Sequence, residues 1–295
     1  MQLRRDFLAR YGPGAARVFF APGRVNLIGE HVDYNGGVVL PVAIELGMYV
    51  AARRRADQNV RLGSTRFRET HELSLDRLRD ARPARAWIDY PVGALRLIAR
   101  DVELPCGLDL LFHGTVPSGS GLSSSAALLV ATLYAASCML GLELARERVA
   151  ELAFLAESQF VGVQCGRMDQ MAAALCPSGH ALLIDLGRQH RQAIALPASA
   201  MSLLVFDSRT RHRLASGGYN QRVAESQSAL RALRQIYGAV EHLGQLSVAQ
   251  GIPGAQLAAR GRGAPRRARG SPRWRGSGTV STPCGASTCR PSAAC

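Results

Sequence analysis

The sequence predicts an α+β fold, in which strands and helices fall in separate stretches of the chain. Residues 16–75 have the alternating apolar pattern of strands, whereas residues 122–161 have the spacing of two apolar helices. Short strands are expected at 179–186 and 201–208, before a long amphipathic helix at 217–238. A doubly wound sheet would need strands and helices in regular alternation. The irregular order therefore indicates the α+β class.

The first half of the chain contains most of the expected strands. Residues 1–12 predict an amphipathic helix, because charges occur throughout and the apolar core of a signal peptide is absent. The other expected elements in this half are strands at 16–29, 38–55 and 59–75, a helix at 86–102 and a strand at 106–117.

Two apolar helices follow, at 122–140 and 145–161. Residues 126–142 contain no charge, but they are rich in Ala, Ser and Thr and fall short of the roughly 20 apolar residues that a membrane span needs. A buried core helix is the better interpretation, and we expect no membrane partner.

The net charge of +14 is distributed unevenly. Residues 251–295 carry eight arginines and no acidic residue, which leaves the first 250 residues a charge of +6. This Arg/Gly/Pro/Ser-rich tail lacks hydrophobic periodicity, so we expect it to be disordered. It is either a genuine basic tail or the product of a GC-rich gene read out of frame. All basic residues are arginine, which excludes a Walker-type lysine and a Schiff base.

The seven cysteines form no C-x-x-C pair, and most lie in apolar segments. Neither a zinc site nor a disulfide framework is indicated. Together with the absence of a signal peptide at the N-terminus, this predicts a cytoplasmic protein.

A glycine- and serine-rich turn precedes the first apolar helix, in the stretch "VPSGSGLSSSAALLVATLY" at 116–134. Small residues let backbone N–H groups approach a ligand closely, and a helix N-terminus favours negative charge. The turn predicts a phosphate cradle of a kind that is neither the P-loop nor the dinucleotide G-x-G-x-x-G loop. Taken alone, it could equally be a simple helix start.

Two further stretches concentrate polar groups. "APGRVNLIGEHVDYNGG", at 21–37, places an arginine, a glutamate, a histidine and an aspartate within ten residues. Glu157 ends an apolar helix, and Asp169 follows a glycine among hydrophobic residues, where a carboxylate is costly without a partner. Each of these groups by itself could be a cap or a surface charge.

Taken together, "GRVNLIGEHVDYNGGVVLP", "VPSGSGLSSSAAL" and "FVGVQCGRMDQMAAALCPSGHALLIDL" resemble the successive motifs of the galactokinase family, in the GHMP kinase superfamily. The resemblance covers residues 16–225 and implies a two-domain GHMP kinase fold with an incomplete C-terminal domain. The expected units are an N-terminal GHMP kinase domain with the sugar and ATP motifs at 1–200, a partial C-terminal GHMP domain at 201–250 and the tail at 251–295.

The resemblance also implies a role for each matching residue. Arg24 and Asp169 match the catalytic pair, in which the arginine lies beside the transferred phosphoryl and the aspartate takes the proton from the C1 hydroxyl. The substrate-binding set is Glu30, His31, Asp33 and Tyr219. The nucleotide-binding set is Gly119, Ser120, Gly121, Leu122, Ser123, Ser124 and Ser125, with Trp87 as an aromatic residue near the adenine. Ser125 and Glu157 match the Mg²⁺ ligands.

The implied activity is phosphorylation of galactose by ATP with Mg²⁺, to give galactose 1-phosphate, in a monomer. Phosphoryl transfer needs the groups in these motifs: a loop for the phosphates, a metal ion, a base and a cation. The family's glycine-rich C-terminal motif is absent, so we expect the activity to be impaired. Val32, Arg167 and Gly218 also depart from the family pattern. The alternatives are a non-catalytic galactose and ATP sensor, or nucleic-acid binding through the basic tail.

Overall fold

A mixed β-sheet with helices on both faces forms the body of the protein, in a computed structural model that describes residues 2–117, 119–197, 201–206 and 218–246. The strands are β1 (Arg17–Asn26), β2 (Val38–Val39), β3 (Pro41–Arg54), β4 (Asn59–Ser64), β5 (Phe67–Ser74), β6 (Leu108–Gly114), β7 (His180–Asp185) and β8 (His190–Ala195). The helices are α1 (Gln2–Tyr11), α2 (Leu75–Leu78), α3 (Asp89–Asp101), α4 (Ser124–Leu140), α5 (Arg146–Leu155), α6 (Met168–Leu175) and α7 (Gly218–Tyr237), with short turns η1 (Asp33–Asn35), η2 (Ala156–Val161) and η3 (Leu243–Gln245).

The long strand β3 organises the eight-stranded sheet. Six strands follow the order β2-β7-β3-β6-β4-β5, and off this path β1 pairs with β3 and β8 with β7. Strand β3 pairs antiparallel with β1 and with β6, and near its start it also pairs with β7. Strand β4 lies parallel to β6 and antiparallel to β5. The register of β1 on β3 shifts between Pro22 and Arg24, an irregularity of the kind that bends a strand locally.

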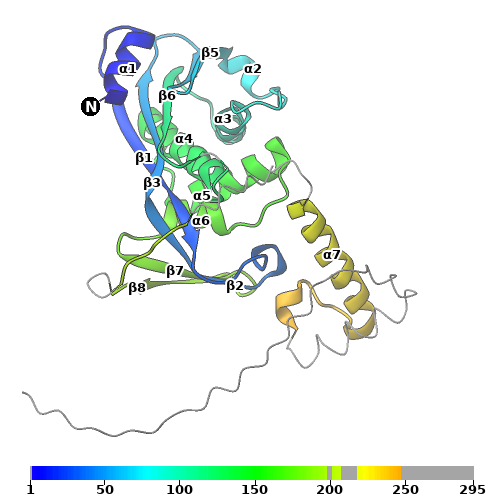
Figure 1. Cartoon of the computed structure of the whole chain (residues 1–295). Helices are drawn as coiled ribbons and strands as arrows, with labels where there is room; N and C mark the ends of the chain where they lie inside the picture. The colour runs from blue at the N-terminus through cyan, green and yellow to red at the C-terminus, as the bar shows by residue number, and fades with distance from the viewer. Residues whose placement is uncertain (1, 118, 198–200, 207–217, 247–295) are drawn as a thin grey trace, which may run out of the picture.

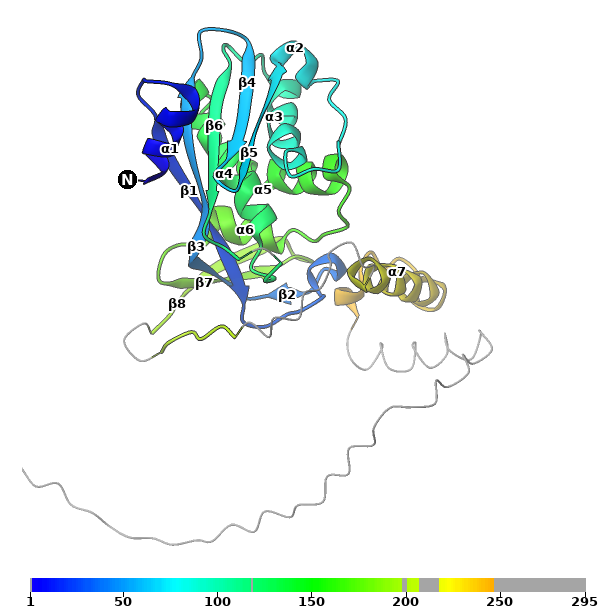
Figure 2. The same ribbon diagram turned by 45° about the horizontal axis from the view of Figure 1, so that its top comes forward.

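The two faces of the sheet bury different sets of side chains, as the period of two in a strand requires. Val50 and Ala52 belong to the main core, whereas Ala51 between them contacts Phe7 and Tyr11 of α1. Helix α1 therefore covers one face, and α3, α4, α5 and α6 cover the other (Figures 1 and 2). The mixture of helices and a mixed sheet confirms the predicted α+β class.

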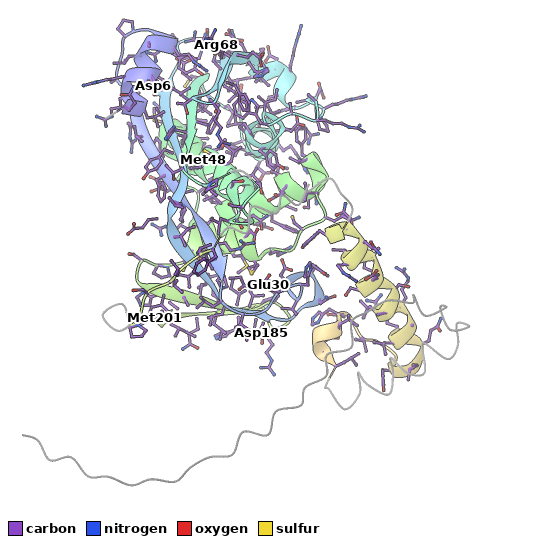
Figure 3. The ribbon with its side chains drawn as sticks, viewed as in Figure 1. Asp6, Glu30, Met48, Arg68, Asp185 and Met201 are labelled. Carbon is purple, nitrogen blue, oxygen red and sulfur yellow. The ribbon has the colours of Figure 1, made fainter. Side chains whose placement is uncertain are left out.

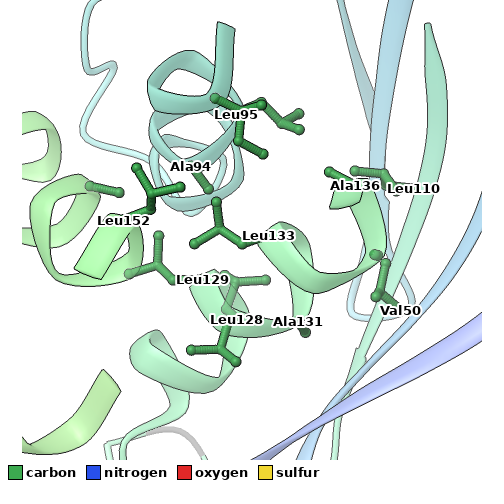
Figure 4. Packing of buried hydrophobic residues seen from close by; sticks show 14 of the residues in the cluster. Val50, Ala94, Leu95, Leu110, Leu128, Leu129, Ala131, Leu133, Ala136 and Leu152 are labelled. Atoms are coloured by element: carbon green, nitrogen blue, oxygen red, sulfur yellow. The ribbon is translucent and has the colours of Figure 1, made fainter. Parts of the chain in front are cut away.

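Helix α4 is the centre of the main core. Ala126, Leu129 and Leu133 are fully buried, and the helix packs between the sheet and helices α3 and α5 (Figure 4). The uncharged stretch at 126–142 thus lies almost wholly in a core helix, as predicted, and this helix ends at Leu140. Across the part of the chain that the structure describes, no helix has the length and apolarity to cross a membrane.

Two predicted strands are wrong in detail. Residues 59–75 form a hairpin of two strands, β4 and β5, with the turn at Thr65 and Arg66. The sequence did not indicate this turn, because neither residue is a glycine or a proline. Residues 201–206, the described part of the strand expected at 201–208, adopt no regular structure. The tail at 251–295, with its predicted disorder, lies outside the described residues.

Helix α7 lies apart from the other helices, beside the turn that contains η1 (Figures 1 and 2). The Ser226 hydroxyl donates a hydrogen bond of 2.5 Å to Asn35 Oδ1, which fixes α7 against this turn. We call residues 30–35 the 30–35 turn. The 30–35 turn follows strand β1 and is held by α7, whose Ser226 comes 191 positions after Asn35 in the chain.

Candidate active site

The glycine–serine loop, residues 119–123, leads into α4. Gly119 and Gly121 both have a φ of +73°, and no atom lies within 4 Å of the position that a Cβ would take at either residue. Ser120 Oγ donates to the carbonyl of Pro117 at 2.8 Å. The loop is therefore closed by its own hydrogen bonds, with glycine where the backbone is left-handed, and it brings exposed backbone to a helix N-terminus.

Strand β1 holds this loop against the sheet. The backbone N–H of Arg24 donates to the carbonyl of Leu122 at 3.2 Å, and Arg24 Nη1 donates to the carbonyl of Gly121 at 2.7 Å. A Cβ at position 23 would lie 2.6 Å from the Leu122 oxygen, so only glycine allows the strand to approach the loop this closely. The opening motif and the loop thus form one surface.

Arg24 and Asp169, which the resemblance implies are the catalytic pair, form an ion pair in the structure. Arg24 Nη2 lies 2.6 Å from Asp169 Oδ1, and Arg24 Nε donates to the same oxygen at 2.8 Å. The second oxygen, Oδ2, accepts a hydrogen bond of 2.6 Å from Ser123 Oγ. Asp169 lies in the first turn of α6, which Met168 anchors on the sheet through buried contacts. The Asp169 side chain is still 28% exposed, so a ligand can reach it.

Glu157 lies on the π-helical turn η2, and only 5% of its surface is exposed. Burial raises its pKa above the ordinary value, although hydrogen bonds from Ser125 and Gln170 act in the opposite direction. Gln170 Nε2 donates to Glu157 Oε2 at 2.7 Å. A buried carboxylate beside a serine hydroxyl at a helix N-terminus is a set of hard oxygen donors, so the residues present fit a Mg²⁺ ion.

The 30–35 turn brings a second carboxylate to the same region. Burial raises the pKa of Asp33, and the nearby Asp169 carboxylate raises it further. A Cβ at position 166 would lie 1.8 Å from Asp33 Oδ2, so Asp33 packs directly on the backbone of Gly166. The first and third motifs, which are far apart in the sequence, therefore meet at the Arg24–Asp169 pair.

Three aromatic rings cluster at this turn. The Tyr219 ring lies 5.5 Å from the His31 ring and 5.6 Å from the Tyr34 ring, measured between centroids. His31 Nδ1 is 3.0 Å from the Tyr34 hydroxyl. Burial, together with the charge of Asp33, raises the pKa of Tyr219. The predicted residue Tyr219 is thus brought to the turn by α7.

Two of the predicted residues stand further from this centre. Glu30 is exposed on the turn between the sheet and α7, where it accepts a hydrogen bond of 2.9 Å from Asn26 Nδ2 (Figure 3). Trp87 packs among the rings of Phe67, His71 and Phe112, at centroid distances of 5.9–6.1 Å. Its role near a nucleotide therefore stays a prediction.

Sequence reasoning missed four features of the site. Gln170 follows Asp169 directly, and because neighbouring helical residues point in different directions it contacts Glu157 and not Arg24. The second is Tyr34, whose hydroxyl contacts His31. The third is Cys165, because burial raises the pKa of its thiol to about 12. The fourth is the bond from Ser123 to Asp169. The buried amide after the motif aspartate was a visible signal, but the serine bond depends on backbone geometry.

The arrangement suits transfer of a phosphoryl group. A backbone cradle at a helix N-terminus, a guanidinium, a solvent-accessible carboxylate and a hard-oxygen metal site converge within one region. These are the groups that phosphoryl transfer to a small molecule would use. Family comparison agrees: residues 5–54 match the galactokinase galactose-binding signature, and residues 89–176 match the GHMP kinases N terminal domain.

Relatives identify the branch within this class. The chain is 48% identical over 235 residues to a galactokinase of Chloroflexus aggregans, a match that covers 79% of this chain and 59% of the relative. The crystal structure of Lactococcus lactis galactokinase complexed with galactose superposes with a TM-score of 0.76 at 31% identity, covering 83% of this chain and 64% of that one. Methanococcus jannaschii mevalonate kinase shares the fold, with a TM-score of 0.54 at 21% identity.

The chain is therefore similar to galactokinases in a family signature, in sequence and in fold. It spans 59% of the length of the Chloroflexus relative.

Proposed function

We propose that this chain phosphorylates galactose at the C1 hydroxyl, with ATP as the phosphoryl donor. One observation carries the proposal: a single guanidinium, that of Arg24, contacts both the Asp169 carboxylate and the carbonyl of Gly121 in the glycine–serine loop. A base for the acceptor and a cradle for the donor are thus held together by one cation, as in-line phosphoryl transfer requires.

The chemistry follows from the two charged side chains. Asp169 accepts the proton of the sugar C1 hydroxyl while the oxygen of that hydroxyl bonds to the γ-phosphorus of ATP. The bond between the γ-phosphorus and the ADP oxygen breaks. Arg24 supplies positive charge where the equatorial oxygens of the phosphoryl group develop negative charge. The pair is already formed in the structure, so little reorganisation is needed during the reaction.

The sugar would be bound by the 30–35 turn. A hexose exposes hydroxyls around its whole ring, so its recognition needs carboxylates and an imidazole at fixed angles. Asp33 is held by its packing on Gly166, and His31 by its contacts with Tyr34 and Tyr219. Both groups are therefore positioned before the sugar arrives.

Ser125 and Glu157 are the residues that would hold Mg²⁺. The ion, when bound, neutralises phosphate charge during transfer. Gln170 also holds the Glu157 carboxylate, because its amide nitrogen lies 2.7 Å from Oε2.

A coupled assay that detects ADP release tests the proposal. The full chain should form ADP only when galactose, ATP and Mg²⁺ are all present. Asp169→Asn keeps the shape of the side chain but removes its basicity. We expect kcat to fall by at least about 10³-fold, since general-base catalysis contributes roughly 10²- to 10⁴-fold. The charge of Arg24 also loses its partner in this variant. Asp57→Asn, at an exposed carboxylate that also pairs with an arginine, is the matched control and should retain the activity of the unmodified chain.

The same experiment separates turnover from simple binding. Galactose-dependent heat of binding without ADP release would refute catalysis and would indicate a sensor. Equal activity in Asp169→Asn and the unmodified chain would refute the assigned base.

A further inference from the structure

We propose that the hydroxyl of Ser123 is a positioning group for Asp169, and not a nucleotide contact or a helix cap. The inference rests on the proposed function, because it concerns the base of that reaction. It assigns to Ser123 a task different from the one implied by its place in the glycine–serine loop.

The first argument is how the contacts divide between the two carboxylate oxygens. Both nitrogens of Arg24 that reach Asp169 contact Oδ1, whereas Ser123 Oγ alone contacts Oδ2, at 2.6 Å. With Arg24 alone, the carboxylate could rotate about its terminal bond, since that torsion is broad in aspartate. A donor on the second oxygen fixes the plane of the group.

The second argument is what the hydroxyl does not do. Ser123 occupies the N-cap position of α4, where serine ordinarily accepts a hydrogen bond from a backbone N–H of the first turn. Here the side chain makes no capping bond. The hydroxyl donates to Asp169 instead, which leaves the first N–H groups of α4 without a side-chain partner and free for a ligand.

The third argument is the backbone of Ser123. Its φ of +59° and ψ of +45° lie in the left-handed region, which residues other than glycine adopt uncommonly. Glycine would fit this conformation without strain. Only 8% of the Ser123 residue is exposed, so its bond to Asp169 is partly shielded from water, which strengthens it.

A consequence is that the loop and the base are linked. The glycine–serine loop contacts Arg24 through Gly121 and contacts Asp169 through Ser123, so neither charged group is placed independently of the loop. A positioning role predicts an effect on kcat, because the geometry of proton transfer changes while the groups that bind galactose and ATP remain.

The test compares Ser123→Gly, Ser123→Asn and Ser123→Asp in the full chain. Ser123→Gly removes the hydroxyl but suits the backbone, so the protein should stay folded while kcat falls about 10- to 100-fold, with each KM within threefold. Asn and Asp both tolerate the left-handed conformation, but only Asn can donate a hydrogen bond. We expect Ser123→Asn to recover kcat to within about fivefold of the unmodified chain, and Ser123→Asp to remain as low as Ser123→Gly.

An unchanged kcat in Ser123→Gly would overturn the proposal, and so would a loss confined to the KM for ATP, which would indicate a nucleotide contact. If the unmodified chain forms no ADP with galactose, the proposed function fails. The contact between Ser123 and Asp169 is then tested separately, by thermal unfolding of the variants. A cycle of Ser123→Gly, Asp169→Ala and the double variant should show coupling of at least about fivefold in the unfolding equilibrium constant. Effects that multiply independently to within about twofold would refute the contact.

Discussion

Asp109, on β6, is the most heavily paired carboxylate among the described residues, and replacing it with asparagine should destabilise the protein strongly. Its side chain is 1% exposed and accepts hydrogen bonds from Arg53, Arg55 and Arg61. The bonds are 2.7 and 3.2 Å from Arg53, 2.9 Å from Arg55, and 2.7 and 3.0 Å from Arg61. Arg53 also donates to the carbonyls of Tyr11, Gly12 and Pro13, so this network fastens the end of α1 to the sheet.

The magnitude follows from these five bonds. Asparagine keeps one acceptor oxygen, so about two charge-assisted bonds are lost, each worth about 1.5–3 kcal/mol. The arginine side chains are 14–27% exposed, and water offsets part of this loss. We expect Asp109→Asn to cost about 3 kcal/mol, the lower end for breaking a buried ion pair. Melting should then fall by roughly 6–12 °C, at about 2–4 °C per kcal/mol for a domain of this size.

Differential scanning calorimetry measures this change, and Asp57→Asn provides the control. Asp57 also pairs with Arg55, but its side chain is 48% exposed and exposed ion pairs contribute little to stability, so Asp57→Asn should melt close to the unmodified chain. If the two variants melt within about 2 °C of each other, the argument from burial is refuted.

The pH dependence gives a second check on Asp109. Burial acts to raise its pKa, but the hydrogen bonds from Arg61, Arg55 and Arg53 outweigh burial and hold the pKa below the usual range. A pKa lowered by folding stabilises the folded state fully above the unfolded pKa of about 3.9, and this stabilisation is lost as pH falls below that value. The difference in unfolding free energy between the unmodified chain and Asp109→Asn should be constant from about pH 7 to 5 and shrink by pH 3. A difference that is the same at pH 7 and pH 3 would contradict the assigned cause.

Three further substitutions test the packing around the site. Gly23→Ala places a Cβ 2.6 Å from the Leu122 carbonyl, so the glycine–serine loop must shift; we expect kcat to fall about 10²-fold while circular dichroism stays unchanged. Leu129→Ala empties part of the core under α4 and should cost about 3–4 kcal/mol by urea titration, whereas Ile28→Ala, 69% exposed, should cost less than about 1 kcal/mol. Ser123→Ala should melt about 2–4 °C below Ser123→Gly, because alanine keeps the left-handed strain that glycine relieves; the reverse order would show that φ is not strained there.

Elements with a strong periodic signal were predictable from the sequence. The helix expected at 217–238 is observed as α7, and the uncharged stretch at 126–142 is the buried helix α4, because few alternatives can bury an apolar run of that length. Strand β8 was not predicted. All six of its residues are exposed, and they show no alternation of apolar and polar side chains. The strand is ordered by its pairing with β7.

The site was predictable only through its motifs. Arg24 and Asp169 are 145 positions apart, and no local pattern predicts that a strand and a distant helix will bring them into contact. The direction of the Ser123 hydroxyl depends on a left-handed backbone that a serine in the sequence does not indicate. The motif resemblance gave the set of residues, and the structure gave which of them touch.

The position of α7 has a consequence for how the protein is made. Ser226 and Tyr219 reach the 30–35 turn from the far end of the described chain, whereas the sheet and the central helices close among residues 2–197. Domains fold as they leave the ribosome, and contacts of long sequence separation form late. A nascent chain halted before residue 218 would therefore hold the Arg24–Asp169 ion pair while His31 and Tyr34 still lack the Tyr219 ring, so the two halves of the proposed site would form at different stages of synthesis.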